Sequence, residues 1–277
     1  MDRNNLDYKE WITGVFDRGA PTYDRVGPRI WSHFGNRLID LAGLHDGASV
    51  LDVGCGRGAI LFPAAEKVGP TGRVIGIDQS EGMVRETTAE VERLGLPNAK
   101  VHLVDVEEGI SFPDEHFDFV FCGYVLYFFD DLVQALSECV RVLKPEGAFL
   151  ASTWGREFDK RWDGFRRIAR SYRDRLRPGP ESNTRGLRDP AEIEEVLSSA
   201  GLVNIEVKAE KQEFYFQDED EWWAFEWSHG NQSLWERMEP SALEQFREEE
   251  YEWIRQLKGD RGIPMWMQML LTKANKP

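Results

Sequence analysis

A glycine-rich bend preceded by an acidic residue is the segment of this sequence best suited to hold a small charged ligand. Residues 52–58 read DVGCGRG and follow a short apolar run that begins at Ser49. Glycines at such a place let the backbone turn tightly and come close to a ligand. The carboxylate of Asp52 would repel a pyrophosphate and attract an ammonium or sulfonium group. The bend therefore favours a cationic cofactor, although its glycines also satisfy the loose dinucleotide-binding pattern.

Two more acidic residues stand where apolar runs end. Asp78 closes the run at 73–78, and Asp105 follows the run at 100–104. In an open sheet of parallel strands, ligands bind outside the carboxyl ends of the strands. A carboxylate at the position of Asp78 can accept hydrogen bonds from the two hydroxyls of a ribose. Asp52, Asp78 and Asp105 are therefore predicted to converge on one crevice.

Aromatic side chains follow two further apolar runs and gather again in the C-terminal part of the chain. Their faces could hold a flat or apolar substrate and favour a nearby positive charge. The residues expected to line the substrate site are Tyr124, Tyr127, Trp154, Trp222, Glu226 and His229. The last three share one stripe of a helix predicted over 219–229. The alternative for such rings is that they form the core of a helical region.

Alternating strands and helices are the elements that must position these residues. The pattern predicts strands over 49–53, 73–78, 100–104, 117–122 and 148–153, with helices over 59–68, 81–94 and 131–142. A helix from Asp189 to Gly201 and strands over 204–216 and 266–273 follow. Strands that alternate with helices form a parallel sheet covered on both faces. The expected fold class is α/β, with a seven-stranded, mostly parallel sheet and helices on both faces.

Segments outside this alternation have helical periodicity and are predicted to form a helical cap. The chain accordingly divides into an N-terminal helical cap segment, a cofactor-binding core, a helical insertion, a core helix with a strand, a tryptophan-rich helical cap insertion and a final core strand. In order, these are residues 1–45, 46–154, 155–188, 189–216, 217–263 and 264–277. The cap is expected to close over the cofactor and exclude water.

Composition disfavours several classes of function. The 277 residues carry 34 Lys and Arg against 49 Asp and Glu, a net charge of −15. This balance disfavours nucleic acid, whose phosphates need clustered basic residues, and an anionic membrane surface. The sequence contains no run of about 18 apolar residues, so no membrane span is predicted. The three cysteines lack paired spacing and predict reduced thiols. We expect a cytoplasmic protein with a small-molecule partner and no metal, its oligomeric state left open.

Four segments resemble, in order and spacing, the class I S-adenosylmethionine-dependent methyltransferases. The similar branch contains ubiquinone and menaquinone biosynthesis enzymes and many natural-product methyltransferases. The segments are VLDVGCGRG at 50–58, VIGID at 74–78, FDFV at 117–120 and LKPEG at 143–147. Arg57 departs from the family, which more often has Thr or Ser there. The resemblance implies a Rossmann-like fold and a role in secondary metabolism, with S-adenosylmethionine as cofactor and S-adenosylhomocysteine as product.

The resemblance also implies which residues hold the cofactor. Gly54 and Gly56 would pass close to its amino-acid end, which Asp52 would help to orient. Asp78 would bind the ribose hydroxyls, and Asp105 the adenine amino group. The residues expected around the rest of the cofactor are Tyr23, Gln79, Met83, Val106, Cys122 and Tyr124.

The reaction so implied moves a methyl group to O, N or C of a small, apolar or aromatic metabolite. Because the donor is already activated, the protein must mainly align the partners and supply a base where the acceptor loses a proton. His229 is the first candidate base, with Glu226 one turn earlier to orient it and Tyr127 as a weaker candidate. Two alternatives remain open. One is a protein that binds this cofactor but catalyses a non-methylating reaction such as cyclisation, and the other is an NAD(P)-dependent oxidoreductase.

Overall fold

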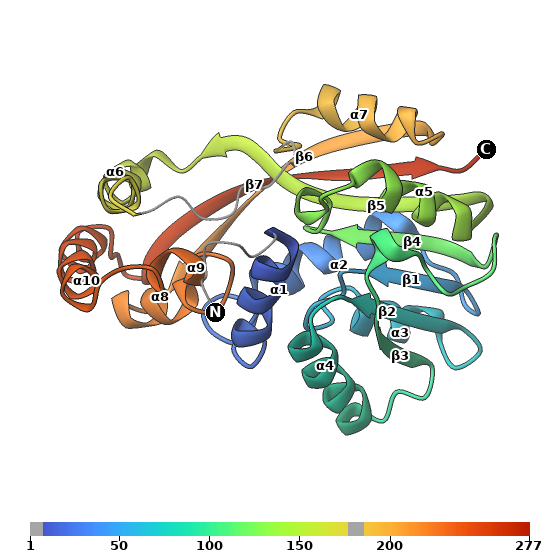
Figure 1. The fold of residues 1–277 in the computed structure, drawn as a ribbon, viewed down its shortest axis with the longest axis horizontal. Helices are drawn as coiled ribbons and strands as arrows, with labels where there is room; N and C mark the ends of the chain where they lie inside the picture. The colour runs from blue at the N-terminus through green and yellow to red at the C-terminus, as the bar shows by residue number, and fades with distance from the viewer. Residues whose placement is uncertain (1–7, 177–185) are drawn as a thin grey trace. The chain divides into compact units, whose positions relative to one another are not determined.

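The computed structural model describes residues 8–176 and 186–277 (Figure 1). Its α-helices are α1 Tyr8–Gly19, α2 Ile30–Ala42, α3 Leu61–Val68, α4 Glu81–Leu94, α5 Leu132–Val142, α6 Asp163–Arg173, α7 Pro190–Ser199, α8 Glu219–Glu226, α9 Gln232–Trp235 and α10 Pro240–Arg255. Its strands are β1 Ser49–Val53, β2 Arg73–Asp78, β3 Ala99–Leu103, β4 Phe117–Gly123, β5 Leu143–Phe158, β6 Val203–Phe216 and β7 Ile263–Asn275. Three 3-10 turns are η2 Val106–Glu108, η3 Leu126–Phe128 and η4 Lys160–Trp162.

The chain divides into two compact units, and each is described by itself. The first, which we call the helical unit, comprises Met1–Ile30, Glu157–Glu181 and Lys211–Gln268. The second, the sheet unit, comprises Trp31–Arg156, Ser182–Glu210 and Met269–Pro277. The boundary falls inside β5, β6 and β7, because each of these strands is long. The domain limits predicted from the sequence, and closure of a cap, remain predictions.

The sheet has seven strands in the order β3-β2-β1-β4-β5-β7-β6. In the parallel part of the sheet, β1 lies between β2 and β4, and Val50 of β1 aligns with Val74 of β2 and with Phe119 of β4. β2 also pairs in parallel with β3, and β4 with β5. The arrow of β7 runs against that of β5 (Figure 1). The predicted mostly parallel sheet is thus confirmed, and the carboxyl ends of β1 to β5 share one edge.

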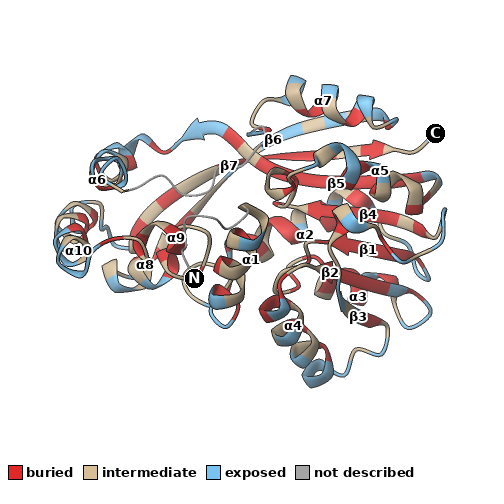
Figure 2. Cartoon of the chain, viewed as in Figure 1, coloured by how far each residue is buried: buried red, intermediate tan, exposed pale blue. Residues whose placement is uncertain are grey.

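Helices cover both faces of the sheet, as the alternation predicts. A Cβ placed on Gly76 would lie 2.6 Å from Leu61 Cδ1, so this face of β2 meets α3. Ile75 and Ile77 point to the opposite face, because side chains alternate along a strand. There they share one buried cluster with Leu136 of α5 and with residues of α7. Figure 2 shows the central strands buried along most of their length.

The prediction for the fifth strand is wrong in its limits. Residues 148–153 were expected, but β5 spans Leu143–Phe158 and includes the Lys-Pro-Glu-Gly segment that predicts a turn. Phe117 of β4 pairs with Leu143, while Phe119 pairs with Ala148, so the register shifts between them. The turn-forming residues therefore sit in an irregularity inside the strand and do not end it.

The helical unit has an apolar core of its own. Tyr172, Trp235, Met238 and Phe246 are buried in one cluster. The rings of Trp235 and Phe246 are stacked with centroids 4.6 Å apart. Part of the tryptophan-rich C-terminal sequence therefore serves packing, because aromatic side chains bury more apolar area than other residues.

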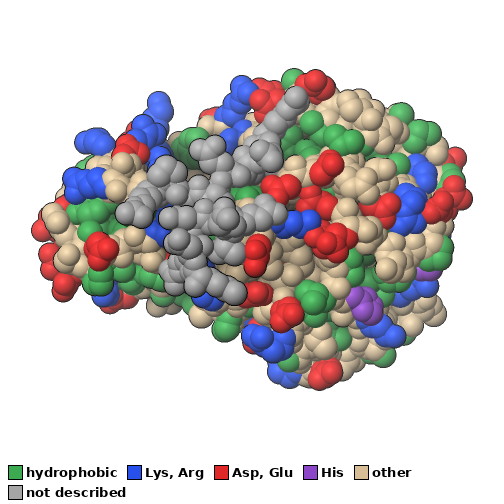
Figure 3. All heavy atoms as spheres, in the orientation of Figure 1, with side chains coloured by type: hydrophobic (Ala, Val, Ile, Leu, Met, Phe, Trp, Pro, Cys, Tyr) green, Lys and Arg blue, Asp and Glu red, His purple; other side chains and the backbone are tan. Residues whose placement is uncertain are grey.

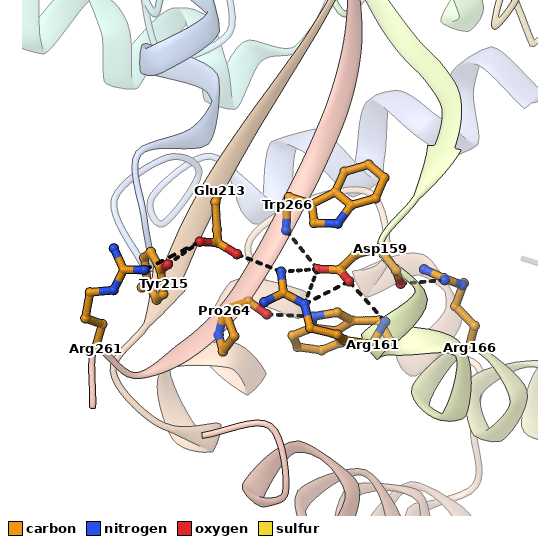
Figure 4. A network of polar contacts seen from close by, with 9 residues as sticks. Asp159, Arg161, Arg166, Glu213, Tyr215, Arg261, Pro264 and Trp266 are labelled. Carbon is orange, nitrogen blue, oxygen red and sulfur yellow. Dashed lines mark hydrogen bonds and ion pairs between the residues drawn. The ribbon is translucent and has the colours of Figure 1, made fainter. Parts of the chain in front are cut away.

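A buried carboxylate connects segments of the helical unit that are distant in sequence (Figure 4). Asp159, which follows β5, is 3% exposed. It accepts hydrogen bonds from Arg161 Nη2 at 2.7 Å and from the backbone N–H of Trp266 at 3.1 Å. Arg161 Nη2 also donates to Glu213 Oε1 of β6 at 2.8 Å. The residues after β5 are thereby fixed to β6 and to β7.

The surface charges, the helices, the cysteines and the potential metal ligands can be compared with the expectations from composition. Acidic and basic side chains are interspersed on the face shown in Figure 3. Within residues 8–176 and 186–277, none of the helices combines the length and apolar character needed to span a bilayer. Cys55, Cys122 and Cys139 are buried and unpaired. The same residues contain no group of three or more His, Cys, Asp or Glu placed to hold a metal ion.

Candidate active site

The glycine bend follows β1 at the carboxyl edge of the sheet. Gly54, Gly56 and Gly58 have φ angles of 65°, 49° and 80°, a region that side chains with a Cβ rarely adopt. The backbone N–H of Gly54 donates to Ile77 O of β2 at 2.8 Å. A Cβ on Gly54 would lie 2.5 Å from Val125 Cγ2, so a larger residue does not fit. The bend is therefore fixed between the ends of β2 and β4.

Asp78, at the end of β2, is attached to this bend through backbone amides. Its Oδ2 accepts from Gly56 N at 2.9 Å, and its Oδ1 accepts from Ser80 N at 2.9 Å. Ser80 caps α4, because its Oγ accepts from Met83 N at 3.1 Å. Both carboxylate oxygens are thus oriented by backbone amides of the chain itself.

Asp52 lies under the bend as a buried carboxyl group. It is 1% exposed, and its Oδ2 has no hydrogen-bond partner among the described residues. Burial, together with the nearby charge of Asp78, raises the pKa of Asp52 well above its usual value. A positive ligand group beside it would favour the charged form instead. The site therefore has an acceptor that a cationic group would satisfy.

Asp105 and its neighbours lie beyond β3. The Oδ1 atom of Asp105 accepts from Glu107 N at 3.0 Å and caps the turn η2. Val106 is 4% exposed and belongs to the core of the sheet unit. On the neighbouring α4, Met83 is 2% exposed, while Gln79 just before it is half-buried. These predicted cofactor residues are all brought to the β2 and β3 side of the carboxyl edge.

The end of β4 leads into a ring cluster. Burial raises the pKa of Cys122, which lies on this strand. Tyr124 has a φ of 56°, unusual for a residue with a side chain. Its ring lies 4.5 Å from that of Trp154 and 5.3 Å from that of Trp31, centroid to centroid. Tyr124 and Trp154 are therefore brought together as predicted, with Trp31 as a third member.

Tyr127 lies a turn further on, in η3. Its half-buried ring is 4.7 Å from that of Phe128. Tyr23, in the helical unit, is also half-buried, with its ring 6.1 Å from that of Phe16. The roles predicted for Tyr127 and Tyr23 remain predictions, because their contacts with Phe128 and Phe16 do not indicate a ligand.

His229 lies outside the helix that was expected to carry it. The prediction of one helix over 219–229 is wrong, because α8 ends at Glu226. His229 Nδ1 instead lies 2.7 Å from Phe225 O, and since a carbonyl only accepts, Nδ1 carries the proton. Burial lowers the pKa of His229 to about 4, so the ring is neutral near pH 7. The basic nitrogen is therefore Nε2, which lies 4.0 Å from Glu226 Oε1.

Glu226 belongs to a buried pair of carboxyl groups. It is 1% exposed and accepts from Asn231 Nδ2 at 3.0 Å. Burial raises its pKa to about 8, so it is largely protonated at neutral pH. Glu250 of α10, 0% exposed, accepts from Trp222 Nε1, and its pKa is raised by burial and by Glu226. Trp222 therefore contacts a carboxyl group of the helical unit.

Two of these residues were not singled out from the sequence. Trp31 lies at helical spacing with other apolar residues of α2, which predicts core packing. Glu250 is one of many acidic residues in a charged helix. No local signal separates them from their neighbours, because each depends on partners more than 25 residues away in the sequence.

Comparison with known proteins decides the family. The family described as "Methyltransferase domain" matches residues 44–173. Nocamycin O-methyltransferase of Saccharothrix syringae is 34% identical over 238 residues, which cover 82% of this chain and 84% of the relative. The chain belongs to the S-adenosylmethionine-dependent methyltransferases. The family and the cofactor that the sequence predicts are thereby confirmed.

Other relatives place the methyltransferase among similar enzymes. Aklanonic acid methyltransferase of a Streptomyces species is 43% identical over 140 residues, 50% of this chain and 63% of the relative. An N-methyltransferase of Haemonchus contortus was solved with S-adenosylhomocysteine. Its alignment with this protein covers 98% of this chain and 60% of the Haemonchus chain, with a TM-score of 0.61 and 18% identity. A [4+2]-cyclase with TM-score 0.51 and 19% identity covers 89% of this chain and 80% of its own. These two structures share the fold alone, and nothing here favours a dinucleotide oxidoreductase.

Proposed function

We propose that this methyltransferase transfers a methyl group from S-adenosylmethionine to an oxygen atom of a small, flat natural-product metabolite. The observation that carries the proposal is the attachment of Asp78 to the glycine bend through Gly56 N. Two relatives named for acting on small molecules, aklanonic acid methyltransferase and nocamycin O-methyltransferase, support the acceptor class. Methylation at nitrogen or carbon, which the sequence also allows, lacks such support.

The residues at the carboxyl edge fit the cofactor. The positive φ angles of Gly54 and Gly56 give a backbone surface that a ligand can approach closely. Asp52 offers a buried carboxyl oxygen without a partner among the described residues, suited to the ammonium group. Asp78 is assigned to the ribose hydroxyls, and Asp105 is assigned to the adenine amino group. Gln79, Met83 and Val106 complete the adenine side, and Cys122 and Tyr124 the methionine side.

His229 is the candidate base for the acceptor's proton. When bound, S-adenosylmethionine supplies a methyl group on a positively charged sulfur. The fixed Nδ1–H of His229 leaves Nε2 as the nitrogen that accepts a proton. Glu226, protonated near neutral pH, would stay uncharged beside it and orient the turn through Asn231. Tyr127 is the weaker candidate, and Trp222 and Trp154 are assigned to the acceptor.

One experiment tests the function directly. Purified full-length protein is titrated with S-adenosylhomocysteine and with NAD⁺ and NADP⁺ in a calorimeter, and then incubated with methyl-labelled S-adenosylmethionine and a panel of aromatic acids and phenols. We expect S-adenosylhomocysteine to bind and the two dinucleotides not to bind. We expect the labelled methyl group to be found in an ether or an ester of the acceptor. Binding of the dinucleotides in its place would overturn the proposal. Turnover of an acceptor without release of S-adenosylhomocysteine would favour the non-methylating alternative.

The role of His229 has its own variant. His229→Gln should lower kcat about 100-fold or more for an acceptor that must lose a proton, as expected for loss of a general base. Its affinity for S-adenosylhomocysteine should stay as in the wild type. A variant with unchanged kcat would remove His229 from the mechanism.

A further inference from the structure

Thr87, in the middle of α4, hydrogen-bonds a segment outside its own helix. The residue is 0% exposed, and its Oγ1 donates to Gly56 O at 2.6 Å. Hydroxyl groups inside helices usually face solvent or donate to the carbonyl group four residues earlier. Thr13 and Ser199 follow that pattern, at donor–acceptor distances of 2.7 Å and 2.8 Å. The hydroxyl of Thr87 instead connects α4 to the glycine bend.

The helix itself gains little from a threonine at this position. The branched side chain of threonine restricts χ1 and makes it a weaker helix former than alanine. A buried hydroxyl also requires a hydrogen-bond partner, and the partner of Thr87 is a backbone carbonyl of the candidate cofactor site. The contribution of this hydroxyl is therefore to be sought in the bend and not in α4.

Gly56 is held on both sides of its Cα. Its N–H donates to Asp78 Oδ2 at 2.9 Å, and its carbonyl oxygen accepts from Thr87 Oγ1 at 2.6 Å. The φ angle of Gly56 is 49°. Because glycine has more conformational freedom than any other residue, fixed contacts decide which way its peptide groups point. Thr87 therefore helps to set the direction in which the N–H of Gly56 meets Asp78.

The hydroxyl of Thr87 is the stronger of two donors at the Gly56 carbonyl. Cys55 Sγ also approaches this oxygen, but at 4.0 Å, and a thiol is a weak donor. A second contact joins the same two segments, since Arg57 Nη1 lies 3.9 Å from Glu86 Oε2. Two consecutive residues of α4 thus contact two consecutive residues of the bend.

We propose that Thr87 is a positioning residue for the cofactor, whose hydroxyl orients Gly56 and, through Gly56, the carboxylate of Asp78. Thr87 itself does not contact the cofactor in this arrangement. The inference rests on the proposed methyl transfer, because it concerns the carboxylate assigned to the ribose hydroxyls. It extends that site to a buried side chain that recognises no part of the ligand.

Three substitutions at Thr87 separate its hydroxyl from the rest of the side chain. Thr87→Val keeps the branched shape and removes the hydroxyl, whereas Thr87→Ser keeps the hydroxyl and removes a methyl group. Thr87→Ala also removes the hydroxyl and introduces a stronger helix former, which safeguards folding. Thr88→Val is the matched control, because Thr88 is half-buried on the same helix and points about 100° away around its axis.

Calorimetry measures the affinity of each full-length variant for S-adenosylhomocysteine. Thr87→Val and Thr87→Ala should each weaken binding about five- to tenfold, the effect of losing one hydrogen bond. Thr87→Ser and Thr88→Val should stay within about twofold of the wild type. Wild-type affinity in the two hydroxyl-free variants would overturn the inference. So would a loss in Thr87→Ser or Thr88→Val as large as that in Thr87→Val.

A double-mutant cycle tests whether Thr87 acts through Asp78. Adding Thr87→Val to Asp78→Ala should change the affinity by less than about twofold, because the carboxylate that the hydroxyl orients is then absent. Equilibrium dialysis with labelled S-adenosylhomocysteine measures these weaker affinities. A further loss of about fivefold or more in the Asp78→Ala background would show independent effects and overturn the inference.

Thermal melting separates positioning from folding. Thr87→Ser loses a buried methyl group, so it should melt below the wild type and still bind S-adenosylhomocysteine as the wild type does. Affinities that fall in step with the melting temperatures of all three Thr87 variants would show a packing role alone and overturn the inference. If S-adenosylhomocysteine does not bind the wild type, the proposed function fails, and this outcome is visible before any variant is compared.

Discussion

Carboxyl side chains of the two units are held in different ways. In the sheet unit, Asp78 accepts from two backbone amides at the glycine bend. In the helical unit, the buried Glu226 and Glu250 accept from the side chains of Asn231 and Trp222, respectively. Burial raises the pKa of both glutamates, to about 8 for Glu226.

The difference shows what backbone donors achieve that side-chain burial does not. Amide groups of a tight bend are fixed in place by the chain and favour a charged acceptor. Asn and Trp donors reach a carboxyl group only through tertiary packing, and two such donors do not offset removal from water. The first arrangement suits charge recognition, whereas the second keeps a carboxyl group neutral.

The largest expected effect concerns Asp78. Asp78→Ala removes the acceptor of Gly56 N and Ser80 N together with the proposed ribose contact, so affinity for S-adenosylhomocysteine should fall at least about 100-fold. Asp118→Asn is the matched control, because Asp118 accepts from Ser49 N and Lys144 at the opposite edge of the same sheet. Calorimetry on both variants checks this. Equal affinity in Asp78→Ala and the control would show that the backbone-held carboxylate does not recognise the ligand.

The second effect concerns the pH dependence of stability. The pKa of Glu226 is raised in the folded protein, so the folded form holds the proton more tightly than the unfolded chain. This stabilisation is complete below about pH 4 and is lost as pH rises to about 8, a change of a few kcal/mol. Glu226→Gln, which stays neutral, should therefore lose less stability than the wild type between pH 5 and pH 8.

Denaturant unfolding at pH 5, 6.5 and 8 measures this difference. The exposed Glu252→Gln on α10 serves as the control and should follow the wild type. Glu250 leaves a slope of the same sign in Glu226→Gln, since burial raises its pKa as well. A Glu226→Gln profile parallel to that of the wild type would mean that Glu226 is not held neutral by burial.

The smallest effect concerns Asp159, a buried carboxylate of the helical unit that does have charged and backbone donors. Arg161 and the amide of Trp266 help hold its pKa below the usual value, against the opposing effect of burial. Its contribution is therefore present at neutral pH and lost as pH falls through the folded pKa. Asp159→Asn should lower the free energy of unfolding at pH 7 by about 1 to 3 kcal/mol. The difference from the wild type should shrink toward pH 3, and a constant difference would contradict the assignment.

Local sequence predicted the sheet unit better than the helical unit. The bend, the cap of α4 by Ser80 and the strand ends at Asp78 and Asp105 follow from short segments whose partners are near in the chain. The limits of β5 could not be predicted in this way, because pairing with β4 overrides the turn-forming residues at 144–147. The end of α8 before His229 could not be predicted either, because there the side chain of His229 hydrogen-bonds the carbonyl oxygen of Phe225.

What the sequence by itself determined is the family, the fold class and the identity of the cofactor. These depend on glycines and carboxylates at fixed spacing, whose chemistry can be recognised from segments of a few residues. Only the tertiary structure decided which buried groups lack partners or change their protonation. Glu250, for example, acquires its surroundings from distant segments, and burial and hydrogen bonding are properties of those surroundings.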